Sequence, residues 1–224
     1  MSGFFNRTEA GKALAKALAD RDFHDPVILA LPRGGVPVGI ELAREMHAPM
    51  DLVMVRKVGA PRQPELAVAA VVNGDSPQIA INEAIAAHLG LSHDEIERMA
   101  RPQLDEIQRR RAKYLKGRTP VAIEGRTAIV VDDGIATGAT MRASLKAIRQ
   151  RAPANLILAV PVAARDALND IRKDVDEVVC LLEPRELLAI GAHYSEFGQT
   201  TDEEVMRLMD EAATFVRKTG RKTE

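Results

Sequence analysis

Residues 129–140 read IVVDDGIATGAT, where a short apolar run ends in two adjacent carboxylates, those of Asp132 and Asp133. Small residues and two hydroxyls dominate the next seven positions, which are Gly134, Ile135, Ala136, Thr137, Gly138, Ala139 and Thr140. A helical pattern opens at Met141, so the segment predicts a strand, a loop and a helix in succession. Because the first turn of a helix exposes backbone N–H groups and the positive end of its dipole, such a loop can bind an anion.

The side chains of this segment point to a phosphorylated sugar as the ligand. Threonine hydroxyls can donate to phosphate oxygens, and glycines allow the backbone to approach a ligand closely. Two carboxylates would repel a phosphate, so they are better suited to accept hydrogen bonds from a sugar diol or to hold Mg²⁺ with its waters. A purely structural alternative stays open, in which the aspartates begin a turn and Thr140 caps a helix. The Walker A and dinucleotide-binding spacings are absent.

Two upstream segments place basic residues beside glycine or proline. In residues 29–43 (LALPRGGVPVGIELA), Arg33 precedes Gly34 and Gly35, so a guanidinium and backbone N–H groups could face an anion. In residues 53–58 (VMVRKV), an apolar run is followed by a basic pair. Taken alone, the first segment also fits a simple strand-to-helix turn, and the second fits a strand leaving the core.

VVDDGIATGAT closely resembles the phosphoribosyl-pyrophosphate (PRPP) binding motif of type I phosphoribosyltransferases, with the apolar run, acidic pair, A-T-G and second threonine in register. The resemblance implies that Asp132 and Asp133 contact the ribose hydroxyls and hold Mg²⁺ indirectly, through water or those hydroxyls. It also implies that residues 134–140 wrap the 5′-phosphate. The segment around Gly34 and Gly35 resembles the family's first loop, which binds pyrophosphate.

The remaining basic residues and loops follow in the order of the family. By resemblance, Arg33, Arg56 and Lys57 are the catalytic residues, which stabilise charge on departing pyrophosphate. Residues 59–64 (GAPRQP) resemble the mobile loop over the site, and residues 159–167 (AVPVAARDA) resemble the third loop beside the substrate. The implied reaction is displacement at ribose C1 by a nitrogenous acceptor, through an oxocarbenium-like transition state, with PRPP as donor and Mg²⁺ as cofactor.

The resemblance covers most of residues 27–182 and looks closest to a group of stand-alone predicted phosphoribosyltransferases with a helical insert. The stretches LPRGGVP, RKVGAP, PELAVAAV and EFGQTTDEEV carry that likeness. Ala136 stands where 6-oxopurine enzymes have a proton-accepting Asp, and Asp133 is kept where uracil-type enzymes have proline. An adenine-like or non-purine acceptor is therefore expected.

Tyr194 and Phe197 are the expected acceptor-binding residues. They lie in a terminal segment of the kind that forms the family's variable acceptor-binding hood, and the chain is only 3% aromatic. A base offers a π-face on which such rings can stack. The alternative is that both rings belong to a small satellite core.

These loops need a scaffold that brings the ends of several strands together. Short apolar runs at residues 27–31, 52–55, 66–72, 128–131, 156–160 and 175–182 alternate with helical patterns. This alternation is typical of an α/β fold with a mostly parallel sheet, here of about five strands, flanked by helices. We expect a single domain over 1–224, with a small hood from about 1–22 and 183–200.

A helical insert is expected at about residues 82–116. Ser92 and Glu95 form a capping-box pattern, and apolar residues then recur at helical spacing. Pro102 should kink or split this helix. The same stretch holds a basic run, which consists of Arg109, Arg110, Arg111 and Lys113. Such a run is usually a solvated helix face, with a phosphate- or partner-binding role as the alternative.

Composition and charge exclude several classes of protein. The 224 residues are 46% hydrophobic and 28% charged, as in an ordinary soluble globular protein. A net charge of −1 gives no general attraction to nucleic acid or membrane. Cys180 is the single cysteine, which excludes an internal disulfide and a Cys-rich zinc site. No run is long enough for a membrane helix and no secretory signal is evident, so a cytoplasmic protein is expected.

The expected partners are PRPP, pyrophosphate and a small-molecule acceptor, without membrane or nucleic acid, and a homodimer is left open. Two other classes of function remain open. One is a regulator that senses PRPP or a nucleotide without turnover, favoured only by the basic run. The other is a phosphate-ester hydrolase on the same fold.

Overall fold

Five parallel strands form the main sheet of the protein, whose computed structural model describes residues 3–72 and 78–215. In spatial order they are β2 (Met50–Leu52), β1 (Pro26–Ala30), β6 (Thr127–Val131), β7 (Asn155–Val162) and β8 (Glu177–Leu182). All five residues of β6 are buried, as expected for a strand covered on both faces. The predicted α/β fold with a parallel sheet of about five strands is therefore confirmed.

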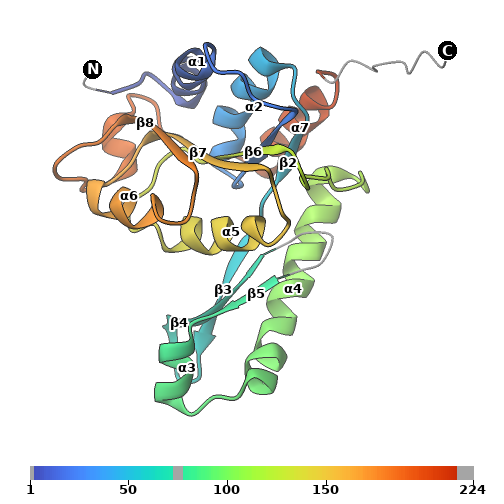
Figure 1. The fold of residues 1–224 in the computed structure, drawn as a ribbon, viewed down its shortest axis with the longest axis vertical. Coiled ribbons are helices and arrows are strands. Elements are labelled where there is room, and N and C mark those ends of the chain that lie inside the picture. Colours follow the sequence, from blue (N-terminus) through green and yellow to red (C-terminus); the bar gives the residue numbers. More distant parts are fainter. Residues whose placement is uncertain (1–2, 73–77, 216–224) are drawn as a thin grey trace.

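Helices cover both faces of this sheet (Figure 1). One face carries α1 (Arg7–Leu18), α2 (Gly35–Met46) and α7 (Asp202–Ala212), and the other carries α5 (Ala139–Arg149) and α6 (Arg165–Ile171). Each face has its own hydrophobic cluster, one around Ile28 and Ile129 and the other around Leu29 and Val130. Successive β1 and β6 side chains point to opposite faces, which explains why both strands are apolar throughout.

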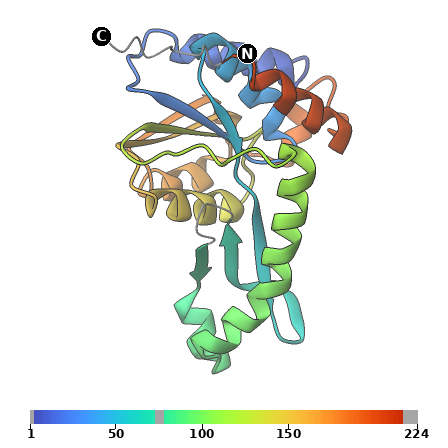
Figure 2. The same ribbon diagram turned by 90° about the vertical axis from the view of Figure 1, so that its right-hand side faces the viewer.

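A second, three-stranded antiparallel sheet projects from the main sheet, as Figures 1 and 2 show. It contains β3 (Val55–Ala60), β4 (Gln63–Val72) and β5 (Gln78–Ile81), and it leads into α3 (Glu83–Leu89) and α4 (His93–Leu115). We call residues 55–115 the arm.

The arm contains the helices predicted at about 82–116, which are α3 and α4, and its three-stranded sheet precedes them in the chain. Residues 66–72, expected in the parallel sheet, form β4 instead, because the tight turn at Pro61–Arg62 pairs them with their neighbours β3 and β5. Residues 59–64 form the tip of this hairpin, with Arg62 at a φ of 65°.

Helix α4 runs the length of the arm. Its predicted capping box is present, since Ser92 accepts from the Glu95 N–H and Glu95 accepts from the Ser92 N–H. Pro102 lies inside one continuous helix, so of the two predicted outcomes, a kink or a split, the split does not occur. Buried Ile96 and Ile107 hold the helix to the arm on both sides of the proline, which offsets the hydrogen bond that the ring removes.

The basic run on α4 is paired within the chain. Arg109 and Arg110 donate to Glu106, and Lys113 donates to Asp202 of α7 at 2.6 Å. Arg111 donates to the buried Asp51 of β2 at 3.0 Å. Arg111 and Lys113 therefore attach the arm to the core, and Arg109 and Arg110 lie on the solvent-exposed part of the helix.

The terminal segments predicted to form a hood lie together, and we use the name hood for the N-terminal segment, α1, the 3₁₀ helix η1 (Ile190–His193) and the chain around η1. Phe4 pairs with Tyr194 and brings the two terminal segments together. Residues 1–2 of the predicted hood and residues 216–224 of the predicted domain lie outside the described residues. None of the helices within 3–72 and 78–215 has the length and apolar character needed to cross a membrane.

We predict that Asp51→Ala destabilises the protein strongly. The Asp51 carboxylate is buried and accepts from Arg111 and from the backbone N–H groups of Leu52 and Val121. Its removal leaves a poorly solvated guanidinium and two N–H groups without their acceptor, a change that typically costs about 3 kcal/mol. The expected drop in melting temperature is roughly 6–12 °C, measured by differential scanning calorimetry.

Arg109→Ala is the matched control, because it removes a more exposed ion pair from the same helix. It should change the free energy of unfolding by about 0.5 kcal/mol or less. If Asp51→Ala behaves like this control, Asp51 does not anchor the arm.

Candidate functional site

The order of the strands identifies one crevice at the carboxyl edge of the main sheet. Neighbouring strands β1 and β6 are followed by helices on opposite faces, α2 on one and α5 on the other. The loops after these two strands therefore diverge, and such a topological switch point is where open parallel sheets bind ligands. The loop after β1 carries Arg33, Gly34 and Gly35, and the loop after β6 carries Asp132 and Asp133.

The two loops touch through their glycines. A side chain on Gly34 would overlap the carboxylate of Asp133, and a Cβ on Gly35 would lie 2.7 Å from the carbonyl oxygen of Val131 and 3.0 Å from the Cα of Asp132. The Gly35 N–H donates to the Leu31 carbonyl at 3.0 Å. Gly35 therefore serves close packing against the acidic pair, and its N–H group does not face an anion as predicted.

Arg7 and Tyr194 of the hood bind Asp133. The Arg7 Nε donates to Asp133 Oδ2 at 2.7 Å, and only 13% of each side chain is exposed. The Tyr194 hydroxyl donates to the Asp133 backbone carbonyl at 2.6 Å. Sequence reasoning gives Arg7 no role beyond membership of the hood, because nothing in the local pattern indicates a partner 126 positions away.

The two predicted acceptor-binding rings pack within the hood. Tyr194 is 7% exposed, lies 5.7 Å from the Phe4 ring and stacks on Phe197 with 4.9 Å between ring centroids. The Arg7 guanidinium lies 3.8 Å from the Phe197 centroid. Tyr194 therefore anchors the hood, as in the alternative in which the two rings belong to a small satellite core. The Arg7 guanidinium covers one face of Phe197.

The acidic pair is electrostatically strained. Asp132 Oδ1 accepts from the Asp133 N–H at 2.9 Å. Burial of its carboxyl and the adjacent charge of Asp133 raise the pKa of Asp132 well above its ordinary value. Arg7 partly offsets this effect. A ligand whose hydroxyls donate to these oxygens would favour the ionised carboxylate.

The loop after the acidic pair is held at three points. The Ile135 N–H donates to Val162 and its carbonyl accepts from Ala164. Gly134 packs against Ile190, whose Cγ2 would lie 2.5 Å from a Cβ there, so this glycine makes room for the hood. Gly138 has a φ of 76°, which a residue with a side chain adopts only with strain, and it caps α5.

On either side of Gly138, the exposed residues Ala136 and Thr137 of the loop and Ala139 and Thr140 of α5 form one continuous stretch of chain. The N–H groups of the first turn of α5 have no intrahelical acceptors, because a helix leaves those groups unpaired. Two threonine hydroxyls and these N–H groups share one surface at a helix N-terminus. That surface has the composition of a phosphate cradle.

The predicted catalytic cations are distributed over two elements. Arg33 follows a cis peptide bond and lies with its NH1 atom 3.5 Å from Asp202 Oδ1 of α7. Arg56 and Lys57 lie within β3 instead of at the end of a core strand, on opposite faces of it. Arg56 donates through Nε to Gln103 of α4 at 2.8 Å.

A directly bound metal has few ligands here. Among residues 3–72 and 78–215, no group of three or more His, Cys, Asp and Glu side chains could hold an ion. Mg²⁺ usually keeps several waters and takes one or two carboxylates plus substrate phosphates. Asp132 and Asp133 supply two carboxylates beside an anion cradle, so the donor set fits Mg²⁺ that arrives with a phosphorylated substrate.

Comparison with known proteins gives a consistent result. A family model described as phosphoribosyl transferase domain matches residues 6–193. A Mycobacterium tuberculosis protein named "Putative phosphoribosyl transferase" is 40% identical over 212 residues, which is 95% of this chain and 47% of that protein. The crystal structure of TT1426 from Thermus thermophilus is similar with a TM-score of 0.83 and 40% identity, covering 93% of this chain and 98% of that one. The chain spans about half the length of the curated relatives it matches.

We predict that Asp132→Asn raises the melting temperature of the ligand-free protein at neutral pH. Because the pKa of Asp132 is higher in the folded state than in the unfolded chain, the folded state keeps a proton that the unfolded state has lost between those two pKa values. Stability therefore falls as the pH rises through that interval and stays lowered above it. The amide can still accept from the Asp133 N–H but cannot ionise, so this loss disappears.

Calorimetry at acidic and neutral pH checks this prediction. The difference between variant and wild type should be larger at neutral pH than at acidic pH. Asp170→Asn, which changes an exposed carboxylate paired with Lys173, should give no such gain. A melting temperature of Asp132→Asn at or below that of the wild type at neutral pH would contradict the assignment of strain to Asp132.

Proposed function

The chain belongs to the phosphoribosyl transferase domain family, and on that premise we propose that it transfers the phosphoribosyl group of PRPP to a nitrogenous acceptor. In this reaction the bond between ribose C1 and the pyrophosphate oxygen breaks, a bond from the acceptor nitrogen to C1 forms, and pyrophosphate leaves. One observation carries the proposal. An acidic pair, a glycine loop with an arginine and a threonine-rich helix N-terminus meet at the switch point of the sheet.

Asp132 and Asp133 are suited to the ribose diol. Each carboxylate has oxygens that accept hydrogen bonds, and a vicinal diol offers two donors. Arg7 occupies only Oδ2 of Asp133 among the four oxygens of the pair. Holding the diol fixes the orientation of C1 relative to the incoming acceptor.

Residues 134–140 are suited to the 5′-phosphate. The exposed N–H groups and the hydroxyls of Thr137 and Thr140 can donate to its oxygens, and the dipole of α5 favours its charge. The fixed points at Ile135 and Gly138 hold this surface rigid, so the phosphate can anchor the sugar while C1 reacts.

We assign to Arg33 the stabilisation of negative charge on the departing pyrophosphate, with Lys57 as a second cation. Arg33 lies directly before Gly34, which contacts Asp133, so its loop borders the ribose position. Mg²⁺, when bound with the pyrophosphate, supplies further neutralisation of charge. Arg56 is directed to α4 through Gln103, and we therefore give it a place in the arm's packing. A covalent nucleophile is not required, and burial raises the pKa of the Cys180 thiol to about 11.

The acceptor and the rival functions remain to be separated by experiment. Ala136 disfavours the proton transfer used with 6-oxopurines, so we propose an adenine-like or non-purine acceptor. The basic run that favours a nucleic-acid-binding regulator is paired with Glu106, Asp51 and Asp202, which lowers its net positive charge. Pyrophosphate release that needs an acceptor would exclude both the sensor and the hydrolase.

We predict that PRPP with Mg²⁺ raises the melting temperature of the wild type. Ligand at 100 times its Kd stabilises a protein by about 2.7 kcal/mol, which for a chain of this size is a shift of roughly 5–11 °C. The double variant Asp132→Asn with Asp133→Asn should lose most of this shift, because an amide oxygen accepts more weakly than a carboxylate.

A double variant of Asp20→Asn with Asp22→Asn is the matched control, since it makes the same charge change at two exposed residues after α1. It should keep the PRPP shift of the wild type. Equal PRPP shifts in the wild type and the Asp132/Asp133 variant would remove the ribose assignment.

Gly138→Ala should weaken the binding of ribose 5-phosphate and PRPP alike. Its φ of 76° disfavours any side chain, and a Cβ would lie 3.2 Å from Ala167, so the cap of α5 must shift. Gly125→Ala is the control, because Gly125 also has a positive φ but nothing lies within 4 Å of its Cβ position. Calorimetric titration should show about a tenfold loss at Gly138, the scale of one charge-assisted hydrogen bond. Similar affinities in both variants would argue against a phosphate at this loop.

A further inference from the structure

The carboxylate of Asp202 connects three parts of the molecule. It is the first residue of α7, and its Oδ1 lies 3.5 Å from NH1 of Arg33 in the loop after β1. From α4, the Tyr114 hydroxyl donates to Oδ1 and the Lys113 ammonium donates to Oδ2, both at 2.6 Å. The arm and the candidate pyrophosphate loop therefore share one acceptor.

This carboxylate is well fixed. Tyr114 is 2% exposed, so its hydroxyl can move little, and Thr201 caps α7 by accepting from the Glu204 N–H. The N-terminal end of the helix dipole also favours a negative charge there. Hydrogen bonds from Lys113 and Tyr114 lower the pKa of Asp202 to about 2, so it is ionised at physiological pH.

Arg33 depends on this contact for its orientation. Its side chain is 36% exposed, and a long exposed arginine otherwise samples many rotamers. Asp202 contacts Arg33 through NH1 alone, and this 3.5 Å contact is longer than the 2.6 Å contacts that Asp202 receives from Lys113 and Tyr114. With respect to the described residues, the remaining guanidinium N–H groups of Arg33 can donate to a second anion.

We propose that Asp202 is a positioning residue for Arg33, which fixes the guanidinium for pyrophosphate and links its position to the arm through Tyr114. This inference rests on the proposed function, because it takes Arg33 to bind the pyrophosphate group. Asp202 contacts no substrate itself.

A role of Asp202 through its charge alone and a role in positioning Arg33 predict opposite changes in pyrophosphate affinity for Asp202→Asn. Removal of a negative charge near an anion site should tighten the binding of pyrophosphate if Asp202 acts only through its charge. Loss of the ionic contact with Arg33 should weaken binding if Asp202 orients the guanidinium. The sign of the change therefore separates the two explanations.

Asp210 provides the matched control. Asp210 lies on the same helix and pairs with Lys116 at 2.6 Å and with Arg118. The substitution Asp210→Asn therefore removes a cluster of ion pairs on α7 similar to that of Asp202. The change in net charge is identical, but among the described residues Asp210 has no contact with Arg33. Tyr114→Phe is a third variant, which weakens the hold on Asp202 without any change of charge.

The experiment is calorimetric titration of inorganic pyrophosphate with Mg²⁺ into each folded variant. We expect Asp202→Asn to bind about fivefold more weakly, Tyr114→Phe about twofold more weakly, and Asp210→Asn like the wild type, in the range found for coupled residues of one network. In an Arg33→Ala background, Asp202→Asn should weaken pyrophosphate binding no further. A general structural defect caused by Asp202→Asn would instead weaken binding in both backgrounds.

Unchanged or tighter binding by Asp202→Asn, or an equal loss in the Arg33→Ala background, would overturn the inference. If Arg33→Ala itself binds pyrophosphate like the wild type, the role of Arg33 fails and this inference fails with it. The PRPP shift carried by Asp132 and Asp133 would survive that result, so the two failures can be told apart. If Asp202→Asn does not fold, Tyr114→Phe decides instead, because weaker pyrophosphate binding by this variant supports positioning and unchanged or tighter binding overturns it.

Discussion

Two adjacent carboxylates at the end of a fully buried strand are a costly arrangement, and much of the surrounding structure compensates for it. Burial and mutual repulsion raise the pKa of Asp132. Arg7 reaches across from the N-terminal segment to pair with Asp133, and the Tyr194 hydroxyl binds the same residue's carbonyl. Gly34 has no side chain because the Asp133 carboxylate occupies that space. The hood is thus attached to the core through the acidic pair, and a sugar diol would take over part of the same compensation.

The sequence predicts those features that arise from local pattern. The buried runs of β1 and β6, the helix after the acidic loop and the capping box at Ser92 all follow from residues within a few positions of each other, although that helix begins at Ala139, before the predicted Met141. The predicted loop after the acidic pair also forms, because its glycines and hydroxyls determine its shape locally, but it ends at Gly138, and Ala139 and Thr140 already belong to α5. These elements suffice to identify the switch point and the candidate anion cradle.

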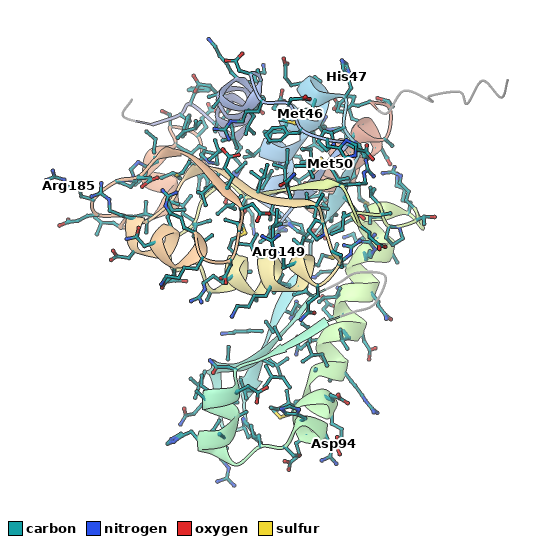
Figure 3. All side chains as sticks on the ribbon, viewed as in Figure 1. Met46, His47, Met50, Asp94, Arg149 and Arg185 are labelled. Atoms are coloured by element: carbon teal, nitrogen blue, oxygen red, sulfur yellow. The ribbon has the colours of Figure 1, made fainter. Side chains whose placement is uncertain are left out.

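The sequence does not predict the features that depend on distant partners. Residues 66–72 are as apolar as a core strand, but a two-residue turn pairs them with β3, and nothing in their composition distinguishes the two sheets. The partners of Arg7, Arg33 and Arg56 lie in other elements of the fold. Figure 3 shows Asp94, near the start of α4, at the far end of the arm, while Lys113 and Tyr114 near its end reach Asp202 of the core. A charged helix face read from sequence cannot reveal which of its residues hold the core.

A crystal structure with ribose 5-phosphate bound tests the central claim most directly. We expect the hydroxyls on C2 and C3 of the ribose within hydrogen-bond distance of the Asp132 and Asp133 carboxylates, and the phosphate on the N–H groups and hydroxyls of residues 136–140. A sugar bound elsewhere, or a phosphate that lies away from α5 while the acidic pair stays closed by Arg7, would contradict the account.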